Sequence, residues 1–221
     1  PGRFLLYTRP VQRRHHLLAL AILVFFPACR QAGKGAPAGT PVVLISIDTL
    51  RSDHLPAYGA RTVATPAIDI LRRDGILYEQ AFSHVPLTLP AHLSMLSGRL
   101  PPEHGVRDNL GFPFAPSVGP WLPEELGKKG YATGGVVSAY VLRAATGISR
   151  GFDTYEDGIA FRGGAVLGNL SRPGSESVTK AVAWLESVRA KPFFLFLHLY
   201  EPHAPYTPPE PFAVQYAGRP Y

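Results

Sequence analysis

Residues 42–47, Val-Val-Leu-Ile-Ser-Ile, form an almost continuous apolar run that is rich in β-branched side chains. Such a run is typical of a strand buried on both faces of a parallel sheet, because a strand with one exposed face carries alternating polar residues. The run ends at Asp48, and open α/β sheets bind their ligands at the carboxyl ends of the strands. We therefore expect a parallel sheet with Asp48 at its ligand-binding edge.

Apolar runs alternate with helix-like periodicities along the rest of the chain. Further strands are predicted at 76–82, 131–139 and 192–197, and helices at 66–73, 121–129 and 177–189. The apolar face of the last helix is expected to consist of Val178, Val182, Leu185 and Val188. Gly134 and Gly135 are expected to weaken the strand that contains them. Strands that alternate with helices predict an α/β fold with a mostly parallel sheet.

The stretch 85–99 has the features of a helix start. Pro90 suits a first helical turn, and Gly98 is placed to end the helix. Thr88 lies at the beginning, where free N–H groups and the helix dipole favour a bound anion. Two interpretations of Thr88 stay open at this point: a simple helix cap, or a nucleophile that shares a site with Asp48.

Several ordered motifs between residue 41 and the end resemble the amino-terminal half of a sulfatase-like hydrolase of the alkaline phosphatase superfamily. The motifs are Ile-Asp-Thr-Leu-Arg-Ser-Asp-His-Leu at 47–55, Thr-Leu-Pro-Ala-His at 88–92, Ser-Gly-Arg-Leu-Pro-Pro-Glu-His-Gly-Val at 97–106, Arg-Gly-Phe-Asp-Thr-Tyr at 150–155 and His-Leu-Tyr-Glu-Pro-His-Ala-Pro at 198–205. The resemblance implies an alkaline-phosphatase-like sheet with helices on both faces. It also implies an Asp-His metal-ligand pair beyond the position of His203. We therefore expect a truncated chain whose fold is incomplete at the C-terminus.

The resemblance also implies roles for individual residues. Typical sulfatases convert a Cys or Ser in a Cys/Ser-x-Pro-x-Arg motif into formylglycine, whereas this chain has Thr88 and His92 in those places. The Thr-x-Pro-x-His pattern is similar to nucleotide pyrophosphatases and phosphodiesterases, in which the threonine itself attacks phosphorus. Asn109, 21 positions after Thr88, matches the asparagine of that group that contacts the phosphoryl oxygens. His203 matches a histidine that contacts the sulfate or phosphate, with a loop histidine as the alternative. His92 is expected either to join the site, one helical turn from Thr88, or to lie on the helix surface.

A divalent metal ion is the implied cofactor, with Asp48 and Thr88 as ligands. Sulfatases usually bind calcium through two adjacent carboxylates, but Thr49 follows Asp48 in this chain. A site with fewer oxygen ligands favours zinc or manganese over calcium. The predicted function is a metal-dependent hydrolase of sulfuric or phosphoric esters with Thr88 as the covalent nucleophile. Two alternatives stay open: a transferase of phospho-alcohol headgroups in the cell envelope, and a catalytically inactive envelope binding protein with the same fold.

The charge distribution separates the first forty residues from the rest. The net charge of +6 comes from six basic residues in 1–40, and the remainder carries sixteen basic and sixteen acidic residues. A neutral domain argues against nucleic-acid binding. Residues 1–28 combine basic residues with an apolar run from Leu17 to Phe26, as a secretory signal does. Cys29 resembles the lipidated cysteine of bacterial lipoproteins, with a plain cleaved signal or an uncleaved anchor as the alternatives.

From these features we expect residues 29–40 to form a flexible tether and residues 41–221 to form the catalytic part. The expected location is outside the cytoplasm of a bacterium, in the periplasm or attached to the membrane through the N-terminus. The expected partner is a small-molecule, glycan or lipid ester.

Overall fold

The computed structural model of the protein describes residues 35–115, 117, 119–160 and 170–217. The chain divides into two compact units, Pro1–Ala38 and Gly39–Tyr221, and the fold reported below is that of the second. The predicted signal peptide at 1–28 and Cys29 lie outside the described residues. Among the described residues, no helix has the length and apolar character needed to cross a membrane.

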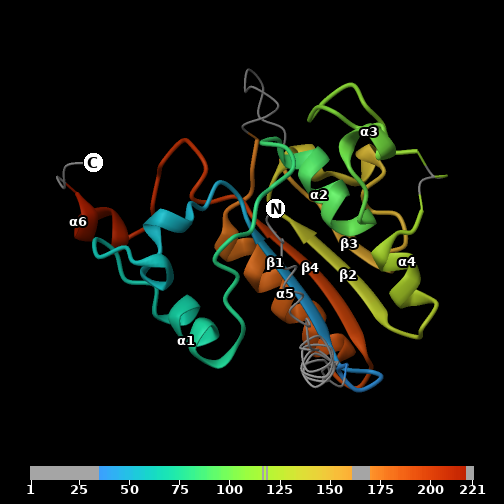
Figure 1. Ribbon diagram of the computed structural model, residues 1–221, viewed down its shortest axis with the longest axis horizontal. Coiled ribbons are helices and arrows are strands. Elements are labelled where there is room, and N and C mark those ends of the chain that lie inside the picture. The colour runs from blue at the N-terminus through green and yellow to red at the C-terminus, as the bar shows by residue number, and fades with distance from the viewer. Residues whose placement is uncertain (1–34, 116, 118, 161–169, 218–221) are drawn as a thin grey trace, which may run out of the picture. The chain divides into compact units, whose positions relative to one another are not determined.

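A parallel four-stranded sheet forms the centre of the described fold (Figure 1). Its strands, in spatial order, are β1 (Val42–Ile47), β4 (Phe193–Leu199), β2 (Ala132–Val137) and β3 (Thr154–Glu156). β4 pairs in parallel with both β1 and β2, and Ser46 of β1 lies opposite His198 of β4. The predicted parallel α/β sheet is confirmed.

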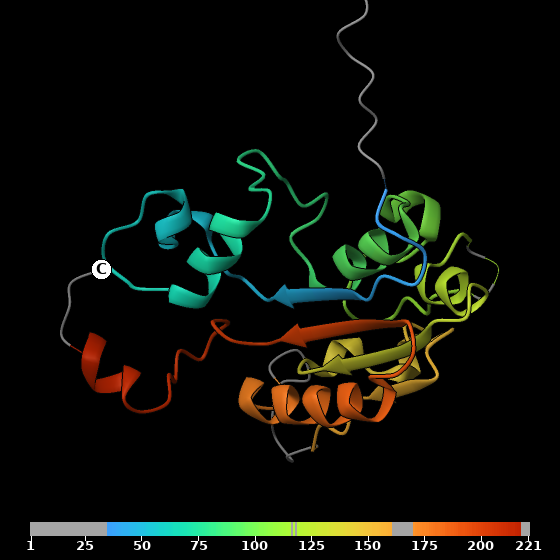
Figure 2. The same ribbon diagram turned by 90° about the horizontal axis from the view of Figure 1, so that it is seen from below.

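Helices cover both faces of this sheet. The α-helices are α1 (Pro66–Asp74), α2 (Thr88–Ser97), α3 (Pro101–His104), α4 (Leu122–Gly127), α5 (Gly174–Val188) and α6 (Phe212–Tyr216). In Figure 2, α5 lies on one side of the strands while α2 and α4 lie on the other. The helices predicted at 66–73, 121–129 and 177–189 are confirmed as α1, α4 and α5, with shifted ends.

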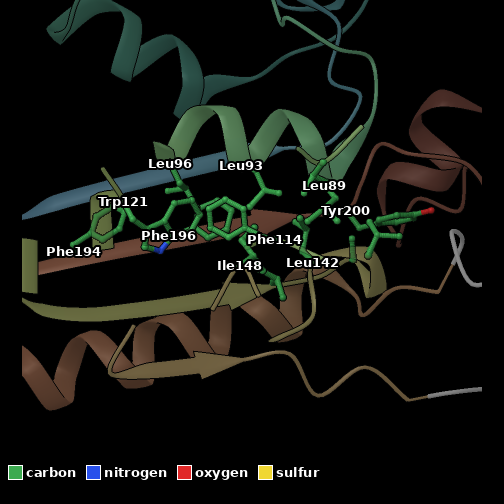
Figure 3. Close-up of a cluster of buried hydrophobic side chains, with 14 residues drawn as sticks. Leu89, Leu93, Leu96, Phe114, Trp121, Leu142, Ile148, Phe194, Phe196 and Tyr200 are labelled. Atoms are coloured by element: carbon green, nitrogen blue, oxygen red, sulfur yellow. The ribbon is translucent and has the colours of Figure 1, made fainter. Parts of the chain in front are cut away.

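The side chains of β4 alternate between two apolar clusters. Phe194 and Phe196 pack into a large cluster with α2, and Leu195 and Leu197 pack into a smaller one beneath α5. Figure 3 shows the leucines of α2 lying between that helix and the sheet. Because both faces of β4 are covered, the strand fixes the positions of helices on both sides.

The prediction that the strand at 42–47 is buried on both faces is wrong. Val43 and Ile45 are about half exposed, with relative exposures of 48% and 50%. The physical reason is the place of β1 in the sheet: it is the outermost strand of the described sheet and pairs with β4 alone. An apolar, β-branched run indicates a strand, but the number of covered faces depends on neighbours that the run itself does not specify.

The strand predicted at 76–82 is also wrong. This segment has no regular structure, and Ile76, Tyr78 and Phe82 expose 83%, 70% and 81% of their surface. A strand needs a partner for its hydrogen-bond ladder, and this segment pairs with none of the described strands. β-propensity without a partner is insufficient to form a strand.

The packed face of α5 agrees with the prediction at Leu185, which packs against the smaller cluster, but differs at its other end. Val178 and Val182 are exposed, whereas the small residues Ser177 and Ala181 are buried against the sheet. Gly134 explains the close approach, because a Cβ atom there would overlap the ring of Trp184 on α5. The two glycines of β2 therefore make room for neighbouring aromatic rings, a role that the prediction of a weakened strand missed.

Candidate active site

A cavity of about 760 Å³ lies where the carboxyl end of β1 meets the beginning of α2. It is lined by all of the residues that the sequence nominated, namely Asp48, Thr88, His92, Asn109 and His203. These residues come from four separate segments of the chain. The fold therefore brings the predicted site residues together at the edge of the sheet where parallel α/β proteins bind ligands.

Thr88 is the first residue of α2, and its hydroxyl faces the sheet rather than capping the helix. The residue in the cap position is Leu87, and no side chain on α2 itself caps this end. The Thr88 hydroxyl donates a hydrogen bond to Asp48, with 3.2 Å between Oγ1 and Oδ2. At the other end of the helix, Gly98 adopts a left-handed conformation and ends α2 as predicted.

Asp48 is held immediately after β1 by a backbone hydrogen bond from its N–H to the carbonyl of Leu199, at 2.9 Å. The chain then turns sharply, because Thr49 has a φ of 54°. This left-handed conformation is unfavourable for a β-branched residue. Thr49 also lines the cavity, so the strained residue lies at the site rather than in a remote loop.

The imidazole of His198 lies beside the Asp48 carboxylate. It is fully buried, and its Nε2 lies 3.4 Å from Asp48 Oδ2. Burial acts to raise the pKa of Asp48, but the adjacent ring of His198, followed by that of His203, holds that pKa below its ordinary value. Asp48 is therefore ionised at neutral pH and can accept the hydroxyl proton of Thr88 in a hydrogen bond.

His92 lies on the buried side of α2, so the alternative of a surface position is wrong. Its Nδ1 is 2.6 Å from the carbonyl oxygen of Thr88, and its Nε2 is 2.7 Å from Ser46 Oγ. Burial, and then the charge of His198, lower the pKa of His92 to about 4. His92 is thus a neutral imidazole at physiological pH, with both ring nitrogens engaged.

Asn109 reaches the start of α2 from a loop. Its carbonyl oxygen accepts a hydrogen bond from the Leu89 N–H at 2.8 Å, which directs its NH₂ group away from that contact. The Ala91 N–H is bonded to the Leu87 carbonyl, and Pro90 has no N–H. Within the described residues, the Thr88 N–H is therefore the one donor of this helix end that remains for an anion.

His203 lies on the loop after β4 and faces the cavity from the opposite side. Its Nδ1 is 2.7 Å from the carbonyl oxygen of Ala204, and its ring stacks on Tyr200 with 4.5 Å between ring centroids. Tyr200 is buried, and burial followed by the Asp48 charge raises its pKa. The stacked, bonded ring leaves Nε2 of His203 for a contact within the cavity.

A family model described as Sulfatase matches residues 40–221, which is most of the chain. The chain belongs to the sulfatase family. Mouse (Mus musculus) iduronate 2-sulfatase is 25% identical over 214 residues, which cover 83% of this chain and 39% of that protein. The chain thus spans well under half of the length of this relative.

Solved structures share the fold of this sulfatase-family chain. One is described as BT4656 in complex with its substrate D-glucosamine-2-N,6-O-disulfate, with a TM-score of 0.64, 20% identity, and coverage of 76% of this chain and 36% of that one. The phosphonate monoester hydrolase of Agrobacterium radiobacter has a TM-score of 0.62, 22% identity and coverage of 78% and 43%. The C-terminal periplasmic domain of EcEptC from Escherichia coli, described as a complex with Zn, has a TM-score of 0.62, 17% identity and coverage of 85% and 51%. At these identities the likeness establishes the alkaline-phosphatase-like fold.

Ser46 and Tyr200 of this sulfatase-family chain also contact site residues but were not predicted from the sequence. Ser46 is the one hydroxyl inside the apolar run of β1, two residues before Asp48, so strand alternation alone places both side chains on one face. The spacing of Ser46 and Asp48 could therefore have predicted that Ser46 lies near the site. Tyr200 gave no comparable signal, because its role depends on the loop that brings His203 over its ring.

Sulfatase-superfamily proteins are typically metal-dependent, and the site of this chain supplies two oxygen donors for a cation. The 3.2 Å between Asp48 Oδ2 and Thr88 Oγ1 allows both oxygens to bind one ion at the usual distances of about 2.0–2.6 Å. The described residues contain no cluster of three or more His, Cys, Asp or Glu side chains arranged to hold a metal. They therefore fit part of a metal site rather than a complete one.

Proposed function

We propose that this chain carries the nucleophile of a hydrolase that cleaves sulfuric or phosphoric esters, with Thr88 as the covalent nucleophile. The observation that supports this most strongly is the hydrogen bond from the Thr88 hydroxyl to an ionised Asp48, within a cavity that Asn109 and His203 also line. A threonine hydroxyl is a weak nucleophile unless a neighbouring base or metal activates it. Asp48 is the group in position to orient that hydroxyl.

The reaction would proceed in two transfers. In the first, Thr88 Oγ1 bonds to the phosphorus or sulfur of the ester and the bond to the alcohol oxygen breaks; the hydroxyl proton passes by way of Asp48 and solvent to that oxygen, which leaves as the alcohol. In the second, water attacks the same atom, the bond to Oγ1 breaks, and one water proton returns to Oγ1. The products are the restored threonine and inorganic phosphate or sulfate, or a phosphomonoester when the substrate is a diester. Because threonine has no route to formylglycine, this differs from the chemistry of sulfatases that use a modified Cys or Ser.

Two donors of this chain, the Thr88 N–H and the Asn109 NH₂, would contact the non-bridging oxygens of the transferred group. His203 would add a third only with a protonated ring, because its Nδ1 proton is already donated to the Ala204 carbonyl and Nε2 of the neutral ring is an acceptor. Fixed donors of this kind stabilise the charge that shifts during transfer, and loss of one costs about 10²–10³ in rate in well-studied cases.

Asp48 and Thr88 would also hold a divalent cation, with zinc or manganese preferred over calcium because Thr49 replaces the second adjacent carboxylate. When bound, such an ion lowers the pKa of the hydroxyl and offsets negative charge on the ester. The remaining ligands would have to come from outside the cluster described here.

The proposed substrate is a small-molecule, glycan or lipid ester outside the cytoplasm. The N-terminal signal-like sequence, with Cys29 as a lipidation site, supports export and attachment to a bacterial envelope. Globomycin treatment of cells that express the protein tests the lipoprotein assignment. Accumulation of an unprocessed precursor is expected, and unchanged processing would contradict it.

Turnover assays test the reaction. Purified protein is incubated with nitrophenyl phosphate, bis-nitrophenyl phosphate and nitrophenyl sulfate, with zinc, manganese, calcium or chelator. We expect hydrolysis of at least one ester that requires a metal and is lost in Thr88→Ala. Transfer to an added alcohol in preference to water would indicate a headgroup transferase instead, and no turnover with unmodified Thr88 would indicate a binding protein.

A further inference from the structure

β1 and α2 are joined by two hydrogen-bonded side-chain pairs that lie next to each other. Ser46 lies on β1, and Asp48 follows two residues later, directly after the strand, with its N–H still bonded to Leu199 of β4, so the two side chains share a face. Thr88 and His92 are four residues apart on a helix, so they also share a face. Ser46 bonds to His92 at 2.7 Å and Asp48 bonds to Thr88 at 3.2 Å, so the two pairs connect the same strand face to the same helix face.

The proton positions in the Ser46–His92 pair follow from hydrogen-bond chemistry. The carbonyl oxygen of Thr88 can only accept, so His92 Nδ1, at 2.6 Å, must carry the proton. In the neutral ring Nε2 is then an acceptor, so the Ser46 hydroxyl donates to it. This assigns a single tautomer of His92 and a single orientation of the Ser46 hydroxyl.

The surroundings of His92 hold its ring in place. The side chain is 5% exposed, and its ring contacts those of Phe196 and His198, with centroid separations of 5.7 and 5.0 Å. A ring fixed by packing and by two hydrogen bonds has no free nitrogen with which to act as a base or as a metal ligand. Its hydrogen bonds end instead on the backbone of Thr88 and on β1.

We propose that Ser46 and His92 are positioning residues that hold the first turn of α2 against β1 and thereby keep the Thr88 hydroxyl on Asp48. This inference rests on the proposed function of Thr88 as the nucleophile. His92 acts through the Thr88 carbonyl, and Ser46 acts through His92. Neither contacts the ester in this scheme.

The same helix offers a matched control. Ser94 Oγ lies 3.1 Å from Nε2 of His104, which is a second buried Ser–His pair, and it connects α2 to α3 rather than to β1. Ser94→Ala and Ser46→Ala therefore delete the same kind of bond from opposite sides of the same helix. Ser94 also lines the cavity, but it bonds to α3 and not to β1, so only the second deletion removes a bond next to the Asp48–Thr88 pair.

Kinetics of the protein with the ester that it turns over give the first test. A displacement of a nucleophile by about 1 Å costs up to about 10²-fold in rate, so Ser46→Ala is expected to lower kcat by about 10- to 100-fold. KM should stay within about twofold, because ester binding does not use Ser46. Ser46→Thr, which keeps the hydroxyl, is expected to restore most of the loss, and Ser94→Ala to leave kcat unchanged. An equal loss of kcat in Ser94→Ala, or no loss in Ser46→Ala, would overturn the proposal.

A spectroscopic readout separates this proposal from the proposed function. In protein labelled with nitrogen-15 histidine, long-range proton–nitrogen spectra at pH 7 should show His92 as the neutral tautomer protonated on Nδ1, and the Nε2 signal should shift in Ser46→Ala but not in Ser94→Ala. If the wild type hydrolyses no ester but these signals appear, the proposed function fails while the hydrogen-bonded pair stands. If His92 is protonated on Nε2, the positioning proposal fails regardless of turnover.

Discussion

β1 and β4 lie side by side in the sheet and have similar apolar sequences, yet they play opposite parts in the molecule. The five central residues of β4 are all buried, whereas half of the residues of β1 are exposed. The difference continues at their carboxyl ends. His198 of β4 is fully buried, and Asp48, just after β1, lines the cavity.

This contrast indicates a division of labour between the two strands. β4 is covered by helices on both faces and supplies the core, so its side chains should determine stability. β1 is the outer strand of the described sheet and leads into the cavity, so Ser46 on β1 and Asp48 just after it should determine activity.

The largest effect is expected from truncation of the β4 core. Phe196→Ala should lower the free energy of unfolding by about 4 kcal/mol, because it removes a fully buried ring and leaves a cavity between α2 and the sheet. Ile45→Ala on β1 should cost less than about 1.5 kcal/mol, since half of that side chain is already exposed. Urea unfolding of both variants measures this difference. Equal losses of unfolding free energy would contradict the claim that β4 contributes more to stability than β1.

Acid destabilisation should come in part from His92, which is packed between β1 and β4. The pKa of His92 in the folded chain is about 4, below the ordinary value of 6.5. Between these two pH values, the imidazole is therefore protonated in the unfolded chain but not in the folded chain. The folded state therefore keeps its full free energy of unfolding above about pH 6.5. As the pH falls towards 4, protonation of His92 in the unfolded chain lowers that free energy by about 3 kcal/mol.

Urea unfolding at pH 7 and pH 4 measures this loss, with His92→Gln as the comparison. The variant should lose less stability between the two pH values than the wild type, because its side chain does not titrate. An identical pH dependence in both proteins would show that His92 is not held neutral in the fold.

On the β1 side, Asp48→Asn should change activity rather than stability. The amide has the same shape but lacks the charge that orients the Thr88 hydroxyl, so kcat/KM should fall by at least about 100-fold, which corresponds to about 2.7 kcal/mol. Its urea midpoint should stay close to that of the wild type. If Asp48→Asn instead lowers the urea midpoint while the folded variant keeps full turnover, Asp48 has a structural role and not a catalytic one.

The smallest effect concerns the turn after β1. Thr49 has a φ of 54°, which glycine adopts without steric cost, so Thr49→Gly should raise the free energy of unfolding by up to about 1 kcal/mol. Thermal unfolding measures the change, with Thr40→Gly as a control outside the left-handed region. Destabilisation in Thr49→Gly would show that contacts of the threonine outweigh the strain.

Local features, and features that depend on ordered sequence motifs, could be predicted from the sequence. The strand at 42–47, the helix that begins at Thr88 and ends at Gly98, and the gathering of the five nominated residues around one cavity were all predictable. The exposure of β1 was not, because coverage depends on which elements fold over a strand. The irregular 76–82 segment was mispredicted for a similar reason, since a strand requires a partner.

In the site, too, contacts between segments that are distant in the sequence could not be predicted. The residue types and spacings of Asp48 and Thr88 carry chemical meaning by themselves, but the capping of Leu89 by Asn109 and the ring stacking of His203 on Tyr200 arise from segments that meet only in the fold. His92 illustrates this best. Its spacing from Thr88 gave the correct helix face, while its neutral, fully bonded state depends on β1 and β4.

Rapid acid quenching followed by mass spectrometry tests the role of Thr88 most directly. Protein mixed with the ester that it turns over is quenched within the first turnover, digested, and searched for an added phosphoryl or sulfuryl group. The added mass is expected on the peptide that contains Thr88 and on no peptide of the Thr88→Ala variant. Turnover that continues in Thr88→Ala, or a modified residue elsewhere in the chain, would contradict the role of Thr88 as the nucleophile.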